Sequence, residues 1–393
     1  MSKKIFLITE FIDASQNTTG YLFEKLYKSF LAQDDLNVVL IAKEDTIIPK
    51  HPHAIYIKSS QVKKDKVLQR VCYELTIGAK FLSKSVGRIK KGDLVFTGTT
   101  PILLLLVVYA LKKLIGFKWV LLVHDVFPEN LVPAKIVSEK NILYKILKYC
   151  FDAVYASADS IIVIGEDMKE LIYSKTKKDA IEVVPNWIDE NDISVEPKIN
   201  NNILNDLGWQ NSDDVVFQFF GNIGRVQGLQ KLIQAIKLMK EIDRAKFIFI
   251  GDGAYAKELK SLIDDLDKDN IIYYGKLDQN KKSIGLNACD VSIVTLAEGM
   301  LGLGVPSKAY YSMAADKLIL AVMDKSSEVY KMVEKNNIGW TVEPNNLQSI
   351  ANQLDNIVRE FKNKKTNSPR EILINKYSEK SAMKKILGIV RRI

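Results

Sequence analysis

Short apolar runs alternate with longer helix-like runs along almost the whole of this 393-residue chain. This alternation is typical of parallel β-sheets, because two parallel strands need a crossover connection, usually a helix, to join them. We predict strands at residues 4–11, 36–42, 55–58, 93–97, 119–123, 160–164 and 181–184, and again at 215–220, 247–250, 271–274, 291–294 and 340–342. The pattern therefore predicts an α/β fold of doubly wound parallel sheets.

The alternation is interrupted between residues 188 and 205, where periodicity is lost and asparagine is frequent. A chain of this length can form two hydrophobic cores of ordinary size. We predict a Rossmann-like N-terminal domain at 1–190, a Rossmann-like C-terminal domain at 191–375, and a helix at 376–393 that packs back toward the first domain. Because ligands bind outside the carboxyl ends of the strands in such sheets, we expect a cleft between the two domains.

Composition excludes several classes of protein. The three cysteines are far apart, which argues against a disulfide framework and a clustered metal site and indicates a reducing compartment. The longest apolar run, at 102–111, lies in a helix that we predict at 102–115 and is shorter than the roughly 20 residues that span a bilayer. The N-terminal run is too short for a secretory signal. The net charge of +9 indicates an acidic partner: a phosphorylated ligand, anionic lipid or nucleic acid.

Residues 290–322 form the most informative stretch, in which strand, glycine-containing loop, helix and strand follow one another. Pro306 and Ser307 suit the helix start, since proline fits the first turn and serine can cap free N–H groups. Lys308 would then lie at a helix N-terminus, where N–H groups and the dipole favour an anion. A phosphate bound beside Lys308 explains a cation at this position, and a solvated surface lysine is the alternative.

A second glycine-containing loop, at 221–228, follows the strand at 215–220 and contains Arg225. Such a loop can surround a diphosphate with the arginine as a forked donor, although tight-turn packing explains the glycines equally well. Arg225 and Lys308 follow strand ends of one predicted sheet, which favours a shared phosphate. No G-x-G-x-x-G follows the first strand and no G-x-x-x-x-G-K-[ST] occurs, which argues against a nicotinamide dinucleotide enzyme and a P-loop NTPase.

These loops belong to a wider set of motifs. They are LLVHDVFPEN (121–130), ADSIIVIGEDM (158–168), VVPNWID (183–189), GNIGRVQGL (221–229), FIFIGDGAYAKEL (247–259), ACDVSIV (288–294) and GVPSKAYYSMAADKLILA (304–321). In this order they resemble bacterial glycosyltransferases of family 4 over nearly the whole chain. The PSK and GNIGR forms resemble the branch that makes capsular, extracellular or O-antigen polysaccharide.

The resemblance implies the GT-B fold, in which two Rossmann-like domains face each other, with the acceptor bound by the first and the nucleotide sugar by the second. It implies retaining transfer of a hexosyl or N-acetylhexosaminyl group, usually from a UDP-sugar, with no metal or other cofactor. Lys308 and Arg225 would stabilise the leaving diphosphate. The donor-binding residues it implies are Gly221, Asn222, Gly224, Gly251, Asp252, Gly253, Glu298, Gly304, Ser307 and Tyr311.

The chain departs from the family at several of these positions. Asn222 and Gln227 stand where an arginine and a lysine are usual, so Arg225 becomes the substitute candidate for the diphosphate. Tyr311 stands where a glutamate often binds ribose, and Glu298 is assigned to donor binding only by its place in the loop. Asp316 stands where glycine is usual, and aspartate tolerates a left-handed conformation better than most residues.

In the first domain, the family position of His124 would face the donor sugar or the acceptor, and a satisfied histidine at a strand end is the alternative. Asp125 lies beside it on the acceptor side. Thr19 and Gly20, in a polar loop that we expect at 17–20 before a helix at 21–31, would lie across the cleft near the diphosphate and acceptor. These four residues complete the predicted site.

A basic stretch at 62–91 indicates an anionic partner. It has nine lysines and arginines against two acidic residues, a balance of +7. On a helix at 62–89, Val67, Val71, Leu75, Phe81 and Leu82 can form an apolar side, as in a helix that lies on an anionic membrane. A core-packed helix with a solvated basic face is the alternative, and the absence of a nucleic-acid module argues against nucleic acid.

These observations predict a cytoplasmic transferase, peripheral on the inner face of the cell membrane, that extends a lipid-linked saccharide of a cell-surface polysaccharide. Two other functions stay open. A UDP-sugar epimerase shares the architecture but needs no acceptor. A nucleotide-sugar-binding subunit with impaired catalysis would explain the unusual Asn222, Gln227 and Tyr311.

Overall fold

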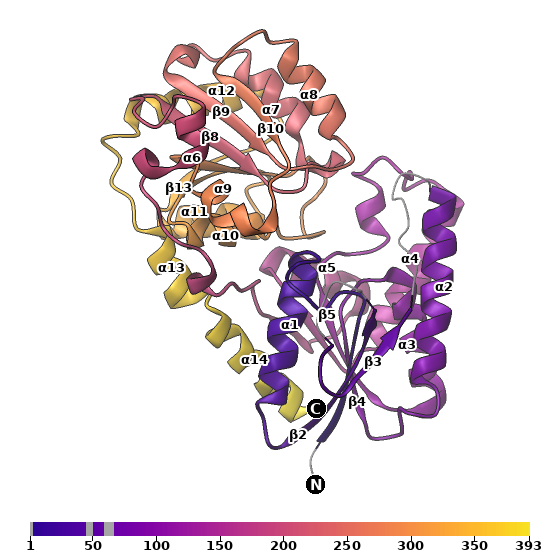
Figure 1. The fold of residues 1–393 in the computed structure, drawn as a ribbon. Coiled ribbons are helices and arrows are strands. Elements are labelled where there is room, and N and C mark those ends of the chain that lie inside the picture. The colour runs from indigo at the N-terminus through magenta and orange to yellow at the C-terminus, as the bar shows by residue number, and fades with distance from the viewer. Residues whose placement is uncertain (1–2, 45–49, 59–66) are drawn as a thin grey trace. The chain divides into compact units, whose positions relative to one another are not determined.

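The computed structural model describes residues 3–44, 50–58 and 67–393, which form two compact units (Figure 1). Unit 1 comprises the described part of Met1–Pro185 together with Gly302–Gly304 and Ala382–Ile393. Unit 2 comprises Asn186–Leu301 and Val305–Ser381. Each unit has its own parallel sheet and its own core, so each is described by itself.

Unit 1 is built on a seven-stranded parallel sheet in the order β3-β2-β1-β4-β5-β6-β7. The strands are β1 (Lys3–Thr9), β2 (Leu36–Lys43), β3 (Ala54–Ile57), β4 (Leu94–Thr97), β5 (Lys118–Val123), β6 (Ser160–Val163) and β7 (Ile181–Val183). The helices are α1 (Thr18–Leu31), α2 (Val67–Ser85), α3 (Ile102–Ile115), α4 (Ile142–Ser157), α5 (Glu166–Thr176) and α14 (Glu379–Arg392), of which Ala382 onward belongs to this unit. The chain reverses strand order between β1 and β4, which makes the sheet doubly wound.

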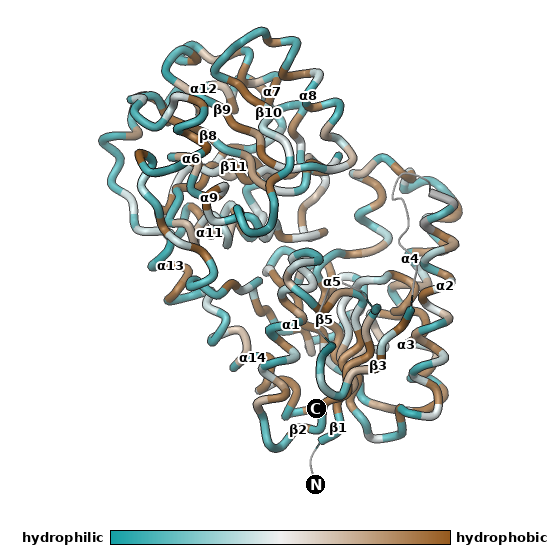
Figure 2. The backbone as a smooth tube through the Cα atoms, viewed as in Figure 1, coloured by the Kyte–Doolittle hydropathy of each residue, from teal (hydrophilic) through white to brown (hydrophobic). Residues whose placement is uncertain are grey.

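The central strands of unit 1 are buried on both faces. Ile5, Phe6, Leu7 and Ile8 of β1 are all at most 1% exposed, although alternate side chains of a strand point to opposite faces. Figure 2 shows the same pattern as hydrophobic strands within a more hydrophilic surface. A sheet with such continuous apolar strands must be covered by helices on both sides, which is the arrangement expected of parallel sheets.

Unit 2 is built on a six-stranded parallel sheet in the order β10-β9-β8-β11-β12-β13. The strands are β8 (Val215–Phe220), β9 (Ala245–Ile250), β10 (Ile271–Gly275), β11 (Val291–Thr295), β12 (Leu318–Val322) and β13 (Gly339–Val342). The helices are α6 (Asn202–Asp206), α7 (Leu229–Ile236), α8 (Ala256–Asp264), α9 (Lys282–Leu286), α10 (Lys308–Ala314), α11 (Glu328–Asn336), α12 (Leu347–Glu360) and α13 (Pro369–Lys376).

Two apolar clusters cover the two faces of the unit 2 sheet. Phe217 and Phe247, from adjacent strands, stack at 4.9 Å in a cluster with the buried side chains of α7, α8 and α12. Val216, which precedes Phe217, and Ile248, which follows Phe247, belong to a smaller cluster with Leu204 of α6. Successive side chains of each strand point to opposite faces of the sheet and therefore contribute to the apolar clusters on both faces, as they do in unit 1.

The structure confirms the α/β fold class with a doubly wound parallel sheet in each unit. Its elements follow the predicted order, and α3 and β8 have the predicted bounds. The expected loop at 17–20 is wrong, because the Asn17 side chain accepts a hydrogen bond from Gly20 N and caps α1 at Thr18. The helix predicted at 62–89 is shorter, at Val67–Ser85, and residues 62–66 lie outside the described residues. Within the described ranges, no helix combines the length and apolarity needed to cross a membrane.

Candidate functional site

Three loops of unit 2 leave the carboxyl ends of the adjacent strands β9, β8 and β11. The first two are joined backbone to backbone: Gly221 N donates to Ile250 O at 2.9 Å, and Ile223 N donates to Asp252 O at 2.9 Å. Gly251 has φ 148°, and a Cβ there would lie 1.9 Å from Gly221 O. Only glycine permits this approach, so the loops after β8 and β9 form one continuous backbone surface.

The other predicted donor residues of these loops lie on that surface. A Cβ at Gly253 would lie 2.4 Å from Ile223 O, and one at Gly224 would lie 3.1 Å from Asn222 Nδ2. Asn222 and Asp252 are both exposed, and Asp252 Oδ1 accepts a hydrogen bond from Gly253 N at 2.7 Å. The sequence-predicted residues after β8 and β9 are therefore brought together at one edge of the sheet.

Lys308 is the first residue of α10 and follows the loop after β11. Its Nζ donates to Gln227 Oε1 at 2.6 Å and lies 3.8 Å from the ring centroid of Phe219. Burial lowers the pKa of Lys308 to about 7, because desolvation disfavours the charged amine. The lysine is therefore held against the loop at 221–228 without a carboxylate partner among the described residues.

Arg225 lies at the end of the neighbouring strand, as predicted, but in a different environment. It begins a 3₁₀ turn, Arg225–Gln227, and its side chain is 60% exposed. Its guanidinium forms an ion pair with Glu258 of α8, with 3.4 Å between Nη2 and Oε1. Such exposed pairs contribute little to stability, so Arg225 is free to exchange this partner for a ligand at small cost.

The remaining residues of the β11 loop differ in their partners. The Ser307 side chain forms no capping hydrogen bond, so the predicted cap is wrong even though Ser307 is the N-cap residue of α10. Glu298 pairs with Lys231 of α7 at the surface. Gly304 belongs to unit 1, where it forms an antiparallel bridge with Asp125. The loop thus contributes to both units, which the sequence did not predict.

Tyr311 is buried in α10 and contacts a lysine that sequence reasoning missed. The Nζ of Lys282, the first residue of α9, lies 3.3 Å from the Tyr311 ring centroid. Burial lowers the pKa of Lys282 to about 8, although the nearby Asp192 carboxylate opposes the shift. Unit 2 therefore has a second lysine whose ammonium is partly desolvated. The five-residue helix α9 gives no periodic signal that would identify it.

In unit 1, His124 and Asp125 follow β5 directly. Their backbone N–H groups both lie 3.4 Å from Thr99 Oγ1, which holds this turn against the end of β4. His124 Nε2 is buried and has no hydrogen-bond partner among the described residues. Burial lowers the pKa of His124 to about 4, so the imidazole is neutral at pH 7 and can donate one hydrogen bond and accept another.

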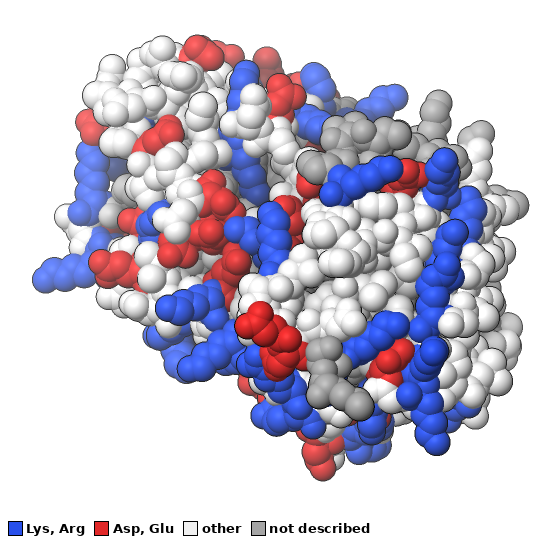
Figure 3. All heavy atoms as spheres, turned by 60° about the horizontal axis from the view of Figure 1, so that its bottom comes forward, with Lys and Arg blue, Asp and Glu red and all other residues white. Residues whose placement is uncertain are grey.

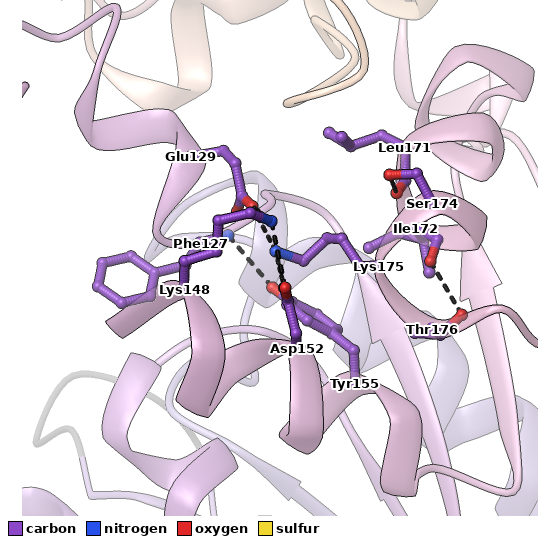
Figure 4. Close-up of polar contacts among 10 residues, drawn as sticks. All are labelled: Phe127, Glu129, Lys148, Asp152, Tyr155, Leu171, Ile172, Ser174, Lys175 and Thr176. Atoms are coloured by element: carbon purple, nitrogen blue, oxygen red, sulfur yellow. Dashed lines mark hydrogen bonds and ion pairs between the residues drawn. The ribbon is translucent and has the colours of Figure 1, made fainter. Parts of the chain in front are cut away.

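The turn continues into a charged cluster that the sequence did not predict (Figure 4). Lys175 of α5 lies between Glu129 and Asp152, at 2.5 Å from Asp152 Oδ1, and Lys148 lies 2.8 Å from Glu129 Oε1. Tyr155 OH accepts a hydrogen bond from Phe127 N at 3.2 Å. The cluster joins the segment after β5 to helices α4 and α5 and fixes where that segment runs.

Thr19 and Gly20 lie in the first turn of α1 rather than in a loop. A Cβ at Gly20 would lie 2.2 Å from Asp13 O, so the residue is glycine because the segment after β1 crosses the helix there. Its N–H group is occupied by the Asn17 cap. In the part of the chain that the structure describes, no group of three or more His, Cys, Asp or Glu side chains is arranged to hold a metal ion.

Comparison with known proteins supplies the family. The family described as "Glycosyl transferases group 1" matches residues 205–371, which include all the unit 2 loops described above. A Pseudomonas aeruginosa protein named "Probable glycosyltransferase WbjE" is 39% identical over 393 residues, covering 99% of this chain and 98% of that protein. The chain belongs to the group 1 glycosyltransferases.

Solved structures have the same fold as this group 1 glycosyltransferase. Sucrose-phosphate synthase from Thermosynechococcus elongatus aligns with a TM-score of 0.78 and 15% identity, covering 99% of this chain and 98% of that one. Anabaena Alr3699/HepE in complex with UDP and glucose aligns with a TM-score of 0.72 and 15% identity, and all of both chains is covered. The GT-B class expected from the sequence is therefore confirmed for this transferase.

Proposed function

We propose that the protein is a retaining glycosyltransferase that moves a hexosyl or N-acetylhexosaminyl group from a UDP-sugar to a lipid-linked cell-surface polysaccharide. One observation carries the proposal. Lys308 is desolvated beside the glycine loops after β8 and β9, and among the described residues its ammonium contacts an amide oxygen and an aromatic ring but no carboxylate. A buried ammonium is stabilised by an anion, and a nucleotide diphosphate supplies one.

The donor would bind along the carboxyl edge of the unit 2 sheet. Its diphosphate would lie near Lys308, with Gln227 Oε1 released from the lysine, and Arg225 would leave Glu258 to contact the outer phosphate. The known complexes of Anabaena HepE with UDP and with UDP-glucose support this class of donor. Gly221, where a Cβ would meet Lys308 Cε at 3.8 Å, would allow the nucleotide to approach the backbone beside the lysine closely.

Catalysis would depend on stabilising the diphosphate as it leaves. Lys308 and Arg225 provide positive charge at that point, which supports transfer without an enzyme nucleophile. The neutral His124 would orient the donor sugar or the acceptor hydroxyl, and Asp125 would lie on the acceptor side. On the same face of the sugar, the acceptor oxygen forms its bond as the diphosphate oxygen departs, and the acceptor proton passes to that oxygen.

A donor screen followed by product analysis tests the proposal. A UDP-sugar present at about 100 times its dissociation constant should stabilise the folded protein by about 2.7 kcal/mol, which thermal unfolding detects. The stabilising sugar nucleotide is then incubated with and without membrane lipid extract. Transfer only in the presence of extract supports the proposal. A new UDP-sugar isomer without extract would indicate an epimerase, and binding with neither product would indicate an impaired subunit.

The acceptor is proposed to be lipid-linked because unit 1 also has a basic surface. Lys90 and Lys91 are exposed after α2, as are Arg88 and the apolar Val86. Figure 3 shows basic side chains in a line along the right-hand edge, where α2 lies, beside broad uncharged areas. Each basic residue near an anionic membrane contributes about 1 kcal/mol, so several together support reversible attachment to the inner face of the cell membrane.

The apolar side proposed for α2 is corrected in part. Val71, Leu75 and Leu82 are exposed, as the membrane hypothesis needs, but Phe81 is fully buried and packs in the core. Lys63, Lys64 and Lys66 lie outside the described residues, and the Val67 side chain is not described. The membrane proposal for α2 therefore depends on the three exposed apolar residues and on the basic residues that follow the helix.

A further inference from the structure

Helix α4 exposes large apolar side chains on its outer face. Ile142 is 71% exposed, Leu143 58%, Ile146 53% and Tyr149 80%. Positions 142, 146 and 149 are spaced by four and three residues and therefore lie along one side of a helix, with 143 beside them. The opposite side of the same helix is buried through Tyr144, Phe151, Val154 and Tyr155. Helix α4 thus has one apolar side in the core and a second in contact with solvent.

The segment before α4 extends this surface. Ile136 is 59% exposed and lies at a shallow hollow of about 560 Å³. The hollow is lined by Val132, Lys135, Ile136, Val137, Ser138, Glu139 and Lys140. Five of the seventeen exposed large hydrophobic side chains in the described residues fall within residues 136–149, so this is a concentration rather than scattered exposure.

The charges around the surface are mostly positive. Lys135, Lys140 and Lys145 are exposed, and Glu139 is the single acidic residue between 135 and 145, which gives a local balance of three minus one, or +2. Apolar side chains flanked by lysines match the two layers of a membrane surface, where acyl chains lie beneath anionic phosphates. Lysine is depleted at protein–protein interfaces, so the flanking lysines favour lipid over a protein partner.

We propose that residues 132–149 form a bilayer-docking surface for anionic membranes. Ile136, Ile142, Leu143 and Ile146 enter the boundary between headgroups and acyl chains, Tyr149 lies at the headgroup level, and the three lysines contact lipid phosphates. The proposal deepens the proposed function, since it rests on a lipid-linked acceptor being reached at the membrane. It differs from attachment through the basic α2 region, because apolar insertion persists when salt screens charge.

Vesicle sedimentation of the full chain tests the surface. The probes are phosphatidylcholine vesicles with and without phosphatidylglycerol, at rising sodium chloride. The apolar variant changes Ile142, Leu143 and Ile146 to glutamine, and its matched control changes the exposed Ile199 and Leu238 of unit 2 to glutamine. We expect the apolar variant to bind anionic vesicles at least about tenfold more weakly at every salt concentration, and the control to bind like the parent.

The charge arm uses Lys135, Lys140 and Lys145 changed to glutamine. We expect binding to anionic vesicles to fall about fivefold per lysine at low salt and by less at high salt. Equal binding by the parent and the apolar variant would overturn the proposal, and so would no binding by the parent. Light scattering tests whether a second copy of the chain occupies the surface instead. If the parent is a dimer, the apolar variant is a monomer and both bind vesicles equally, the surface belongs to a second copy of the chain.

The vesicle-binding experiment tests the docking surface independently of donor binding. All substituted residues are exposed and lie outside the predicted donor and acceptor residues, so UDP affinity and thermal unfolding should match the parent. A protein that binds UDP but not vesicles would overturn only the docking surface. A protein that binds vesicles through residues 132–149 but no sugar nucleotide would overturn only the proposed function.

Discussion

Lys308 and Arg225 were expected to act together, yet they lie in contrasting surroundings. Lys308 is partly buried, and its Nζ contacts an amide oxygen and an aromatic ring. Arg225 is 60% exposed and already paired with Glu258. Both follow adjacent strands of one sheet, β11 and β8, so strand position alone does not determine the strength of an anion site. We expect the degree of desolvation to determine this strength, because it sets the free energy that a bound diphosphate would recover.

Removing Lys308 should have the largest effect. In Lys308→Ala we expect kcat/KM for sugar transfer to fall by about a hundredfold or more, because a preorganised charge at the leaving group is lost. UDP affinity should fall as well, measured by calorimetry. Unchanged UDP affinity in Lys308→Ala would show that Lys308 does not bind the donor, and the proposed difference in donor binding between Lys308 and Arg225 would then be wrong.

Replacing Lys308 by an apolar residue of similar length should have the opposite effect on stability. Burial holds the pKa of Lys308 below its value in the unfolded chain, so the unfolded state binds more protons between about pH 7 and 10 and stability rises with pH in that window. A Lys308→Met variant should therefore unfold at a higher temperature than the parent below pH 7, with a gain that shrinks as the pH rises. Thermal unfolding at several pH values measures this, and a less stable variant at pH 6 would contradict it.

Removing His124 should have the next largest effect. We expect His124→Ala to lower kcat by about ten- to a hundredfold, because the sugar or acceptor loses its orienting hydrogen bond, while UDP affinity stays near that of the parent. Because His124 is neutral at pH 7, His124→Gln, which keeps a neutral donor and acceptor, should restore part of the rate. Full turnover by His124→Ala would leave the residue a structural role only.

The pH dependence of UDP binding sharpens the comparison. With its pKa lowered to about 7, Lys308 loses its charge above neutral pH in the free protein, and UDP affinity should fall by up to about tenfold per pH unit there. A Lys308→Arg variant keeps its charge and should show a flat profile. UDP titrations of both proteins between pH 7 and 9 measure this difference. A UDP affinity of the parent that does not change with pH would contradict the loss of charge on Lys308 in this range.

Removing Arg225 should have the smallest effect. We expect Arg225→Ala to change kcat/KM by no more than about fivefold, in line with an exposed pair that contributes up to about 1 kcal/mol. The effect should fade as salt rises, since exposed charges are screened. Glu258→Gln is the matched control: by releasing Arg225 it should raise UDP affinity slightly. A loss in Arg225→Ala as large as in Lys308→Ala would make the two cations equivalent.

The sequence predicted elements with a strong local signal. Helix α3 is an apolar run that follows a proline, and β8 is a compact run before a glycine, so their bounds were predicted. Asp316, which stands where the family usually has glycine, has a φ of 57° and therefore takes a left-handed conformation that aspartate tolerates. The start of α1 was missed because Gly20 reads as a loop residue, whereas it is needed for the close approach of Asp13.

The missed features are contacts between residues far apart in sequence. Lys308 and Gln227 are 81 residues apart, and the departure from the family at Gln227 became meaningful only when the structure showed it bound to the lysine. Lys282 meets Tyr311 through a five-residue helix too short for periodicity to reveal. Arg225 was located correctly, but its partner Glu258 lies on another helix. Tertiary packing decides such pairs, and sequence patterns do not report it.

Unit 1 is completed by the last residues of the chain. Ala382–Ile393 belongs to it, with Lys3 Nζ donating to Val390 O at 2.8 Å and Arg391 paired with Asp35 at 2.8 Å. A ribosome delivers the whole of unit 2 before these residues appear, and domains fold as they emerge. The surface of unit 1 beneath Ile386 and Ile389 therefore stays uncovered until residues 382–393 have been added, which happens after all of unit 2 has been made.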